Sequence, residues 1–272
     1  MPEALHYEFM RNALAAGLLL SVACGVIGTL VVVNRMVFIS GGVAHAAYGG
    51  IGIAFFFGIP PLLGASLFSV LAAVIMGTLS LRHRHRIDTV IGAVWAGGMA
   101  LGIVLIDLTP GYNVDLMSYL FGSILTVPRG DLLLMAVLDA VVVAVVFLLY
   151  RNFLAMSYDE EFASLRGVPV RALYFLLLVL TSLTVVMTIR AVGLILVIAL
   201  LTIPQFIAER IARSLAVMMA FSCMLGAVFT IAGLWLSYVF NLTSGASIIM
   251  VAVAVLFVFL VGTYVKAAVR LE

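Results

Sequence analysis

The stretch from Asn12 to Val33, NALAAGLLLSVACGVIGTLVVV, carries no charged side chain and is long enough to cross a lipid bilayer as a single helix. About 20 apolar residues in a helix span the hydrocarbon core, where no water is available to hydrogen-bond a bare backbone. Apolar stretches of the same kind recur along the chain as far as Val265. The sequence therefore predicts an all-α polytopic membrane protein.

The composition supports this class for the whole chain. Hydrophobic residues make up 65% of the 272 residues and charged residues 10%, whereas soluble domains are about 45–50% apolar and about 25% charged. We therefore expect a single transmembrane domain over residues 1–272, in contact with membrane lipid. The net charge of +2 gives no sign of a nucleic-acid partner, and none is expected.

About nine membrane spans are expected, two of them short or broken. The spans are placed at Asn12–Val33, Val43–Gly58, Pro61–Ser80, Thr89–Leu108, Leu132–Tyr150, Ala172–Ile189, Gly193–Ile207, Leu215–Phe240 and Ala246–Val265. Glycines loosen the second of these and Pro204 interrupts the seventh. Broken backbone at membrane depth is tolerated where it is buried in protein or lines a cavity. The segment Leu116–Val127 is too short to cross and is expected to be a re-entrant or surface helix.

The distribution of basic residues predicts the orientation, because short cytoplasmic loops carry an excess of Lys and Arg. Nine spans place three of the basic residues on one side of the membrane and the others on the opposite side. The smaller group is Arg11, Arg129 and Arg190, and the larger group is Arg35, Arg82, Arg84, Arg86, Arg151, Arg166, Arg171, Arg210, Arg213, Lys266 and Arg270. We therefore expect the N-terminus outside and the C-terminus in the cytoplasm.

Two ionisable residues lie inside predicted spans, where such side chains are costly and usually face a partner or a cavity. His45 is flanked by two glycine pairs, Gly41–Gly42 and Gly49–Gly50, which let helices approach closely and leave room for a narrow path. Either His45 lines a transport pathway, or it hydrogen-bonds a neighbouring helix and only fixes packing. Asp139 lies in the middle of its span and either contributes to the pathway or pairs with another helix.

The longest polar insertion on the predicted cytoplasmic side, residues 157–171, has the pattern of a short amphipathic helix. Asp159, Glu160 and Glu161 fall in its first turn, where carboxylates favour the positive end of the helix dipole. Phe162 and Leu165 are one turn apart and form an apolar ridge, and Gly167 and Pro169 follow as stop signals. Such a helix either docks in a groove of a soluble partner or is an ordinary solvated loop.

The chain resembles the permeases of the metal-type ABC importers, which carry zinc, manganese or iron. The stretch Tyr158–Val170 resembles the coupling loop of that family. Other matching stretches occur in the family's order: Phe9–Gly17, Arg35–Phe38, His45–Ala47, Tyr119–Leu125, Val192–Val197 with Pro204, Ala212–Leu215, Leu236–Tyr238 and Leu242–Gly245.

This resemblance implies that the chain is one subunit of a transporter in the cell membrane, which is the inner membrane where a cell has two. Two copies of the permease would form the pathway, an extracytoplasmic binding protein would deliver the ion, and a cytoplasmic ABC ATPase would supply the energy. The coupling loop, with Asp159, Glu160, Glu161, Phe162, Leu165, Arg166 and Gly167, would contact the ATPase. The chain has no phosphate-binding Gly-x-x-x-x-Gly-Lys-Ser/Thr motif, so we expect no enzymatic activity and no cofactor in it, with ATP used by the partner.

The sequence departs from the family pattern at the expected metal ligands. The family commonly reads Gly-Asp-Ala-x-Ser-His in the second span. The Asp and the His of this motif lie one helical turn apart, and such a pair suits Zn²⁺ or Mn²⁺. Here Gly41 stands at the Asp position and Ala44 at the Ser position, so that His45 remains, with Asp139 as a possible replacement. Asn241 stands at a second family Asp position. The departures leave open which ion is carried.

Two other classes of function are weighed against the importer. A stand-alone secondary carrier for a small ion or solute would also use broken helices, but it leaves the acidic helix of residues 157–171 without a role. An intramembrane enzyme is disfavoured because the chain has neither a His-Glu-x-x-His zinc motif nor a convincing nucleophile–base pair.

Overall fold

The structure, a computed structural model, describes residues 6–82, 87–110 and 122–269, with side chains as far as residue 265. Within these residues the chain is helical and contains no strand. The predicted all-α class is therefore confirmed. It follows from apolar stretches that must satisfy every backbone hydrogen bond internally.

Eight helices of the described chain are long and apolar enough to cross a membrane. They are α1 (Glu8–Val33), α2 (Val37–Phe57), α3 (Pro61–Arg82), α4 (Ile87–Asp107), α6 (Arg129–Leu148), α9 (Val170–Val192), α11 (Leu215–Phe240) and α12 (Ser244–Val269). A further apolar helix, α10 (Leu194–Glu209), has only 16 residues. Each of the nine predicted spans thus coincides with a helix. Of the two spans expected to be short or broken, α10 is short.

The prediction that α2 is broken is wrong. α2 is one continuous helix that begins at Val37 instead of Val43, so Gly41 and Gly42 lie inside it. α10 also continues through Pro204 without interruption. Of the expected re-entrant segment Leu116–Val127, residues 116–121 lie outside the described chain, and the described part contains a short 3₁₀ helix, η2 (Ile124–Thr126).

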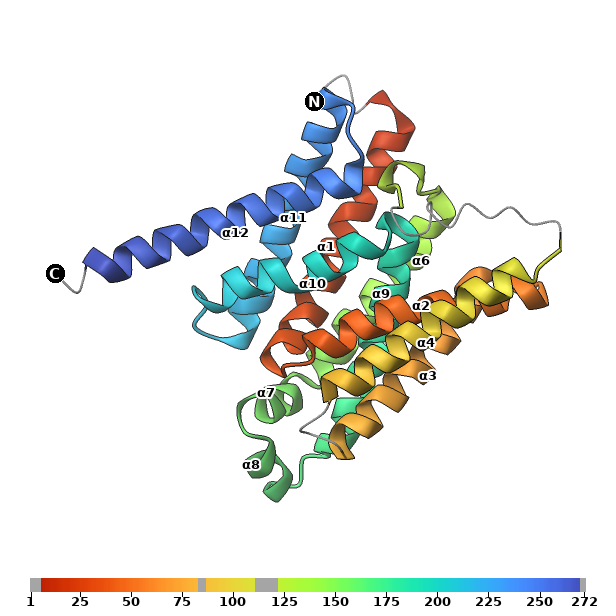
Figure 1. Cartoon of the computed structure of the whole chain (residues 1–272). Coiled ribbons are helices and arrows are strands. Elements are labelled where there is room, and N and C mark those ends of the chain that lie inside the picture. Colours follow the sequence, from red (N-terminus) through yellow and green to blue (C-terminus); the bar gives the residue numbers. More distant parts are fainter. Residues whose placement is uncertain (1–5, 83–86, 111–121, 270–272) are drawn as a thin grey trace.

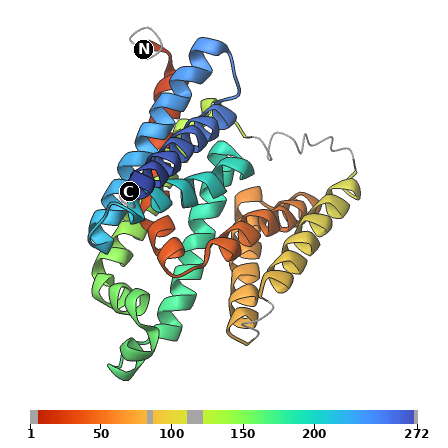
Figure 2. The ribbon, with the colours of Figure 1, turned by 60° about the vertical axis from the view of Figure 1, so that its left-hand side comes forward.

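Two groups of helices make up the bundle. α1 is central to the first group and packs against α11, α10, α6 and α9. In the second group α2 packs against both α3 and α4, and this group lies together on one side of the molecule (Figure 1; Figure 2). α9 contacts α1, α2 and α3 and so connects the groups. α12 extends away from the bundle (Figure 1) and is mostly uncovered in the single chain.

Glycines explain how α2 packs so closely between its neighbours. A Cβ atom built on Gly49 would lie 2.9 Å from the carbonyl oxygen of Gly98 in α4, and one built on Gly52 would overlap the backbone of Gly102. On the α3 side, a Cβ built on Gly50 would lie 2.8 Å from the Cα atom of Ala65. Small residues at such contacts let backbones touch, and packing of this kind drives helix association in lipid. The glycines therefore join α2 to α3 and α4.

Candidate functional site

His45 lies on α2 against Trp95 of α4. The two rings stack with centroids 3.8 Å apart and an interplanar angle of 17°. The Nδ1 atom of His45 is buried and has no hydrogen-bond partner within the described chain. A buried imidazole nitrogen without a partner is unusual in a packed interior. The indole therefore holds the imidazole in place through ring contact, and the hydrogen-bonding capacity of Nδ1 is unused within the described chain.

The position one helical turn from His45 is open. A Cβ atom built on Gly41 would meet a single described atom within 4 Å, the Cδ1 of Ile198 on α10, at 3.8 Å. This is an ordinary van der Waals contact, so a Cβ atom fits there without displacing backbone. Gly42 differs, because its Cβ would lie 3.0 Å from the sulfur of Met76. The glycine at position 41 is thus not imposed by lack of space for a Cβ atom.

Asp139 lies in a different part of the bundle. Its side chain is on α6, which packs against α1 and α9; α2 also contacts these two helices, but α6 and α2 do not pack closely against each other in the described chain. Asp139 is 7% exposed, and its Oδ2 atom has no hydrogen-bond partner in the described residues. The structure therefore does not bring Asp139 and His45 together. Among the residues described, no three His, Cys, Asp or Glu side chains form a group that could hold a metal ion.

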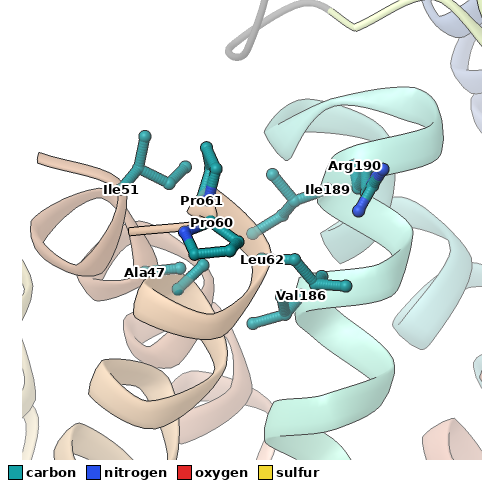
Figure 3. Close-up of a pocket in the computed structure, with 9 residues that line it drawn as sticks. Ala47, Ile51, Pro60, Pro61, Leu62, Val186, Ile189 and Arg190 are labelled. Atoms are coloured by element: carbon teal, nitrogen blue, oxygen red, sulfur yellow. The ribbon is translucent and has the colours of Figure 1, made fainter. Parts of the chain in front are cut away.

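A pocket lies beside α2 at the end of the bundle where α2 and α9 finish. It is lined by Ala47, Ile51, Pro60, Pro61, Leu62, Ala65, Val186, Ile189 and Arg190 (Figure 3). In Figure 3 the two prolines face Val186 and Ile189, with Arg190 at the rim. Arg190 makes an ion pair of 2.8 Å with Asp131 of α6. The lining is largely apolar and offers no ligand to a cation.

Asn241, the second departure from the family pattern, has a structural role. It ends α11 with a left-handed backbone, at φ 54°, and its N–H donates to the carbonyl of Ser237. Asparagine tolerates this conformation better than most residues and is common at such positions. The residue is exposed at the helix end.

The segment 157–171 forms the short helix that the sequence predicts. α7 (Tyr150–Tyr158) is followed by α8 (Glu160–Leu165), and both lie at the end of the bundle away from the N-terminus (Figure 1). Asp159 is the N-cap of α8 and not part of its first turn: its side chain accepts a hydrogen bond of 2.9 Å from the Phe162 N–H. Gly167 has a left-handed backbone at φ 80° and ends the segment as predicted.

The apolar ridge of α8 is exposed in the single chain. Phe162 is 57% exposed and Leu165 is 88% exposed, and the guanidinium of Arg166 lies 5.6 Å from the centre of the Phe162 ring. Ala163 on the same helix is buried and fixes α8 to the rest of the protein. Glu160 and Glu161 are exposed beside the ridge. The helix thus presents large apolar side chains ringed by charges, as docking helices do.

Sequence reasoning missed two residues of α4 and α10. Trp95 was not singled out because a tryptophan in an apolar helix gives no sign of its neighbour. Gln205 is an amide within an apolar helix and is fully buried. Polar side chains at membrane depth usually have a specific role. Its position in an apolar helix next to Pro204 therefore marks Gln205 as a candidate residue in the sequence.

Comparisons with known proteins agree with this architecture. Residues 6–263 match the family model described as the ABC 3 transport family. The chain is 57% identical over 252 residues to the uncharacterized membrane protein slr2045 of Synechocystis sp., covering 93% of this chain and 90% of the relative. It is 35% identical over 250 residues to the manganese transport system membrane protein MntC of Halalkalibacterium halodurans, covering 92% and 86%.

A solved structure supports the same conclusion. The structure described as PsaBC from Streptococcus pneumoniae in complex with Fab superimposes with a TM-score of 0.84 and 30% identity, covering 93% of this chain and 91% of that one. The match extends over nearly all the helices described above. The chain therefore belongs to the ABC 3 transport family and is a membrane-spanning permease of the metal-type ABC importers.

Proposed function

We propose that two copies of this chain form the membrane pathway of an importer that moves a divalent metal ion into the cytoplasm. The ion is zinc, manganese or iron, and manganese is the first to test because it is the cargo named for the relative from Halalkalibacterium halodurans. A separate ABC ATPase supplies the energy, and an extracytoplasmic binding protein delivers the ion. In this arrangement α7 and α8 face the cytoplasm.

The observation that carries the proposal is the exposed ridge of Phe162 and Leu165 on α8. A short helix held in place by the Asp159 cap and the buried Ala163 can transmit a push without unfolding. Burying one large apolar side chain in a partner's groove contributes about 1.5–3 kcal/mol, which is roughly tenfold or more in affinity. Loss of either ridge side chain should therefore weaken the binding of an ATPase subunit by roughly tenfold or more.

His45 is the proposed contact for the metal ion within the pathway. Its Nδ1 atom, which is buried and has no hydrogen-bond partner in the described chain, is a borderline ligand that suits Zn²⁺ or Fe²⁺ better than Mn²⁺. A single imidazole without a carboxylate holds such an ion weakly, which favours passage over storage. Asp139 is on α6, which packs against α1 and α9, and it is not part of the proposed path.

The test replaces Phe162 and Leu165 by serine in the complete transporter. Copurification of the ATPase subunit and uptake of radioactive manganese should fall together, while the amount of permease in the membrane stays the same. Leu242→Ser is the matched control, because Leu242 is 56% exposed and lies between α11 and α12, at the other end of the bundle. Unchanged copurification in the double variant would show that α8 is not the docking surface.

A further inference from the structure

Pro204 leaves a carbonyl group of α10 without its normal hydrogen bond. In an α-helix each N–H donates to the carbonyl four residues earlier, and proline has no N–H to donate. The carbonyl affected is that of Leu200, and the helix nevertheless runs unbroken from Leu194 to Glu209. In a lipid-embedded protein such a carbonyl must find another donor, because no water is present to supply one.

The side chain of Gln205 supplies that donor. Its Nε2 atom donates to the Leu200 carbonyl at 3.0 Å and to the carbonyl of Cys24 in α1 at 2.7 Å. Both amide hydrogens of Gln205 are thereby used, and the side chain is fully buried. The first bond repairs the defect that the neighbouring proline creates. The second ties α10 to α1, which is the central helix of the bundle.

Gly28 of α1 makes the room that this amide needs. A Cβ atom built on Gly28 would lie 2.8 Å from the Cδ of Gln205 and 2.9 Å from the carbonyl oxygen of Leu201. No larger residue fits at this position unless α10 and its amide move away from α1. The three residues therefore depend on one another across two helices far apart in the sequence. Pro204 removes a donor, Gln205 replaces it, and Gly28 leaves space for the amide.

We infer that Gln205 is a positioning residue for the transport pathway. It replaces the hydrogen bond lost at Pro204, and it holds the preceding part of α10 against α1. That part of α10 carries Ile198, the residue that faces Gly41 one turn from His45. Loss of the Gln205 amide frees α10 to shift. Ile198 then moves relative to the face of α2 that carries Gly41 and His45. The effect on transport rests on the proposed function, whereas the effect on stability does not.

The experiment compares Gln205→Leu, Pro204→Ala and the double variant in the complete permease. Gln205→Leu leaves the buried Leu200 carbonyl without a donor, so we expect the thermal unfolding midpoint to fall by on the order of 3 °C. Metal uptake per permease molecule should fall severalfold. In the double variant, the Pro204→Ala change restores a backbone N–H to the Leu200 carbonyl, so the midpoint should recover toward that of Pro204→Ala alone. Uptake should stay low, because leucine at position 205 cannot make the bond to Cys24 that ties α10 to α1.

Thr202→Val is the matched control on the same helix. The Thr202 hydroxyl donates to the Ile198 carbonyl at 2.7 Å, but that carbonyl keeps its helical bond to the Thr202 N–H, so this variant should behave like the wild type.

Recovery of the midpoint in the double variant is the result that a general packing role for Gln205 does not produce. A double variant as unstable as Gln205→Leu would overturn the inference, as would a Gln205→Leu protein with wild-type stability. If Gln205→Leu does not fold, the double variant decides: folding supports the inference and failure overturns it. Recovery of both stability and uptake would retain the bond to Leu200 and overturn the positioning of the pathway, because the double variant lacks the bond to Cys24.

Discussion

Replacing Gly41 by aspartate recreates the carboxylate–imidazole pair expected from the family pattern, at a position where this structure has room for a Cβ atom. The Cβ of the new residue would rest 3.8 Å from the Cδ1 of Ile198, without a clash. With no cation present, a carboxylate inside a membrane helix costs at most about 2.5–3.5 kcal/mol, the value for the helix centre; Gly41 lies in the second turn of α2. Gly41→Asp should therefore be less stable than the wild type in a chelating buffer.

A bound divalent ion should remove most of that cost. An ion present at about 100 times its dissociation constant stabilises the folded protein by about 2.7 kcal/mol, which is close to the cost of the carboxylate. We expect manganese to raise the unfolding midpoint of purified Gly41→Asp by on the order of 5 °C and that of the wild type by much less. The measurement is thermal unfolding in detergent with and without manganese.

Gly41→Asn is the control for this experiment, because asparagine has the same shape without the charge. Its midpoint should respond to manganese as weakly as that of the wild type. If Gly41→Asp and Gly41→Asn respond alike, the space beside His45 is not part of an ion path, and the role proposed for His45 loses its support.

Three further predictions follow from the same geometry. His45→Gln should abolish manganese uptake in cells while leaving the permease in the membrane, since it removes the basic nitrogen; normal uptake would make the histidine a packing residue. Single cysteines in a cysteine-free protein should report the orientation. An impermeant reagent should label position 243 on intact cells and position 164 only after permeabilisation. The reverse pattern would contradict the proposed topology. Gly52→Val should destabilise the protein by about 1–3 kcal/mol, because its side chain would overlap the backbone of Gly102; an unchanged unfolding midpoint would show that α2 and α4 do not touch there.

The helices could be predicted from the sequence because membrane spans are determined by length and apolarity alone. α11 is found with the predicted bounds, Leu215–Phe240. The α8 helix could be predicted for a similar local reason, since its carboxylates, its apolar pair and its final glycine all lie within a few residues of one another; that Asp159 is its N-cap is known only from the structure. These features depend on the chain's immediate surroundings and on the solvent, and not on distant contacts.

The error at α2 has a different origin. Glycines lower the intrinsic stability of a helix, and this favoured a break near Gly49 and Gly50. In the bundle the same glycines permit backbone contact with α3 and α4, and the packing gained there outweighs the intrinsic cost. Whether a glycine breaks a helix or tightens a contact depends on the residue that faces it. That residue is on another helix and cannot be read from the local pattern.

The site was the least predictable part because its contacts join distant residues. Nothing near His45 in the sequence indicates that it stacks on Trp95. The bond from Gln205 to Cys24 likewise crosses most of the chain. Ionisable residues in apolar helices could be selected as candidates from the sequence, but their partners became visible only in the folded structure.

Membership of the family determines the fold of this permease more firmly than it determines the ion. At 30% identity the helices superimpose on those of PsaBC with a TM-score of 0.84, because many combinations of apolar residues pack the same bundle. An ion, in contrast, responds to individual ligand atoms, and the family's aspartate is replaced here by Gly41. The surrounding helices leave space for a Cβ atom at that position. Under the proposed function, the difference at Gly41 is therefore a change in the ligand atoms offered to the ion, since packing does not exclude a Cβ there.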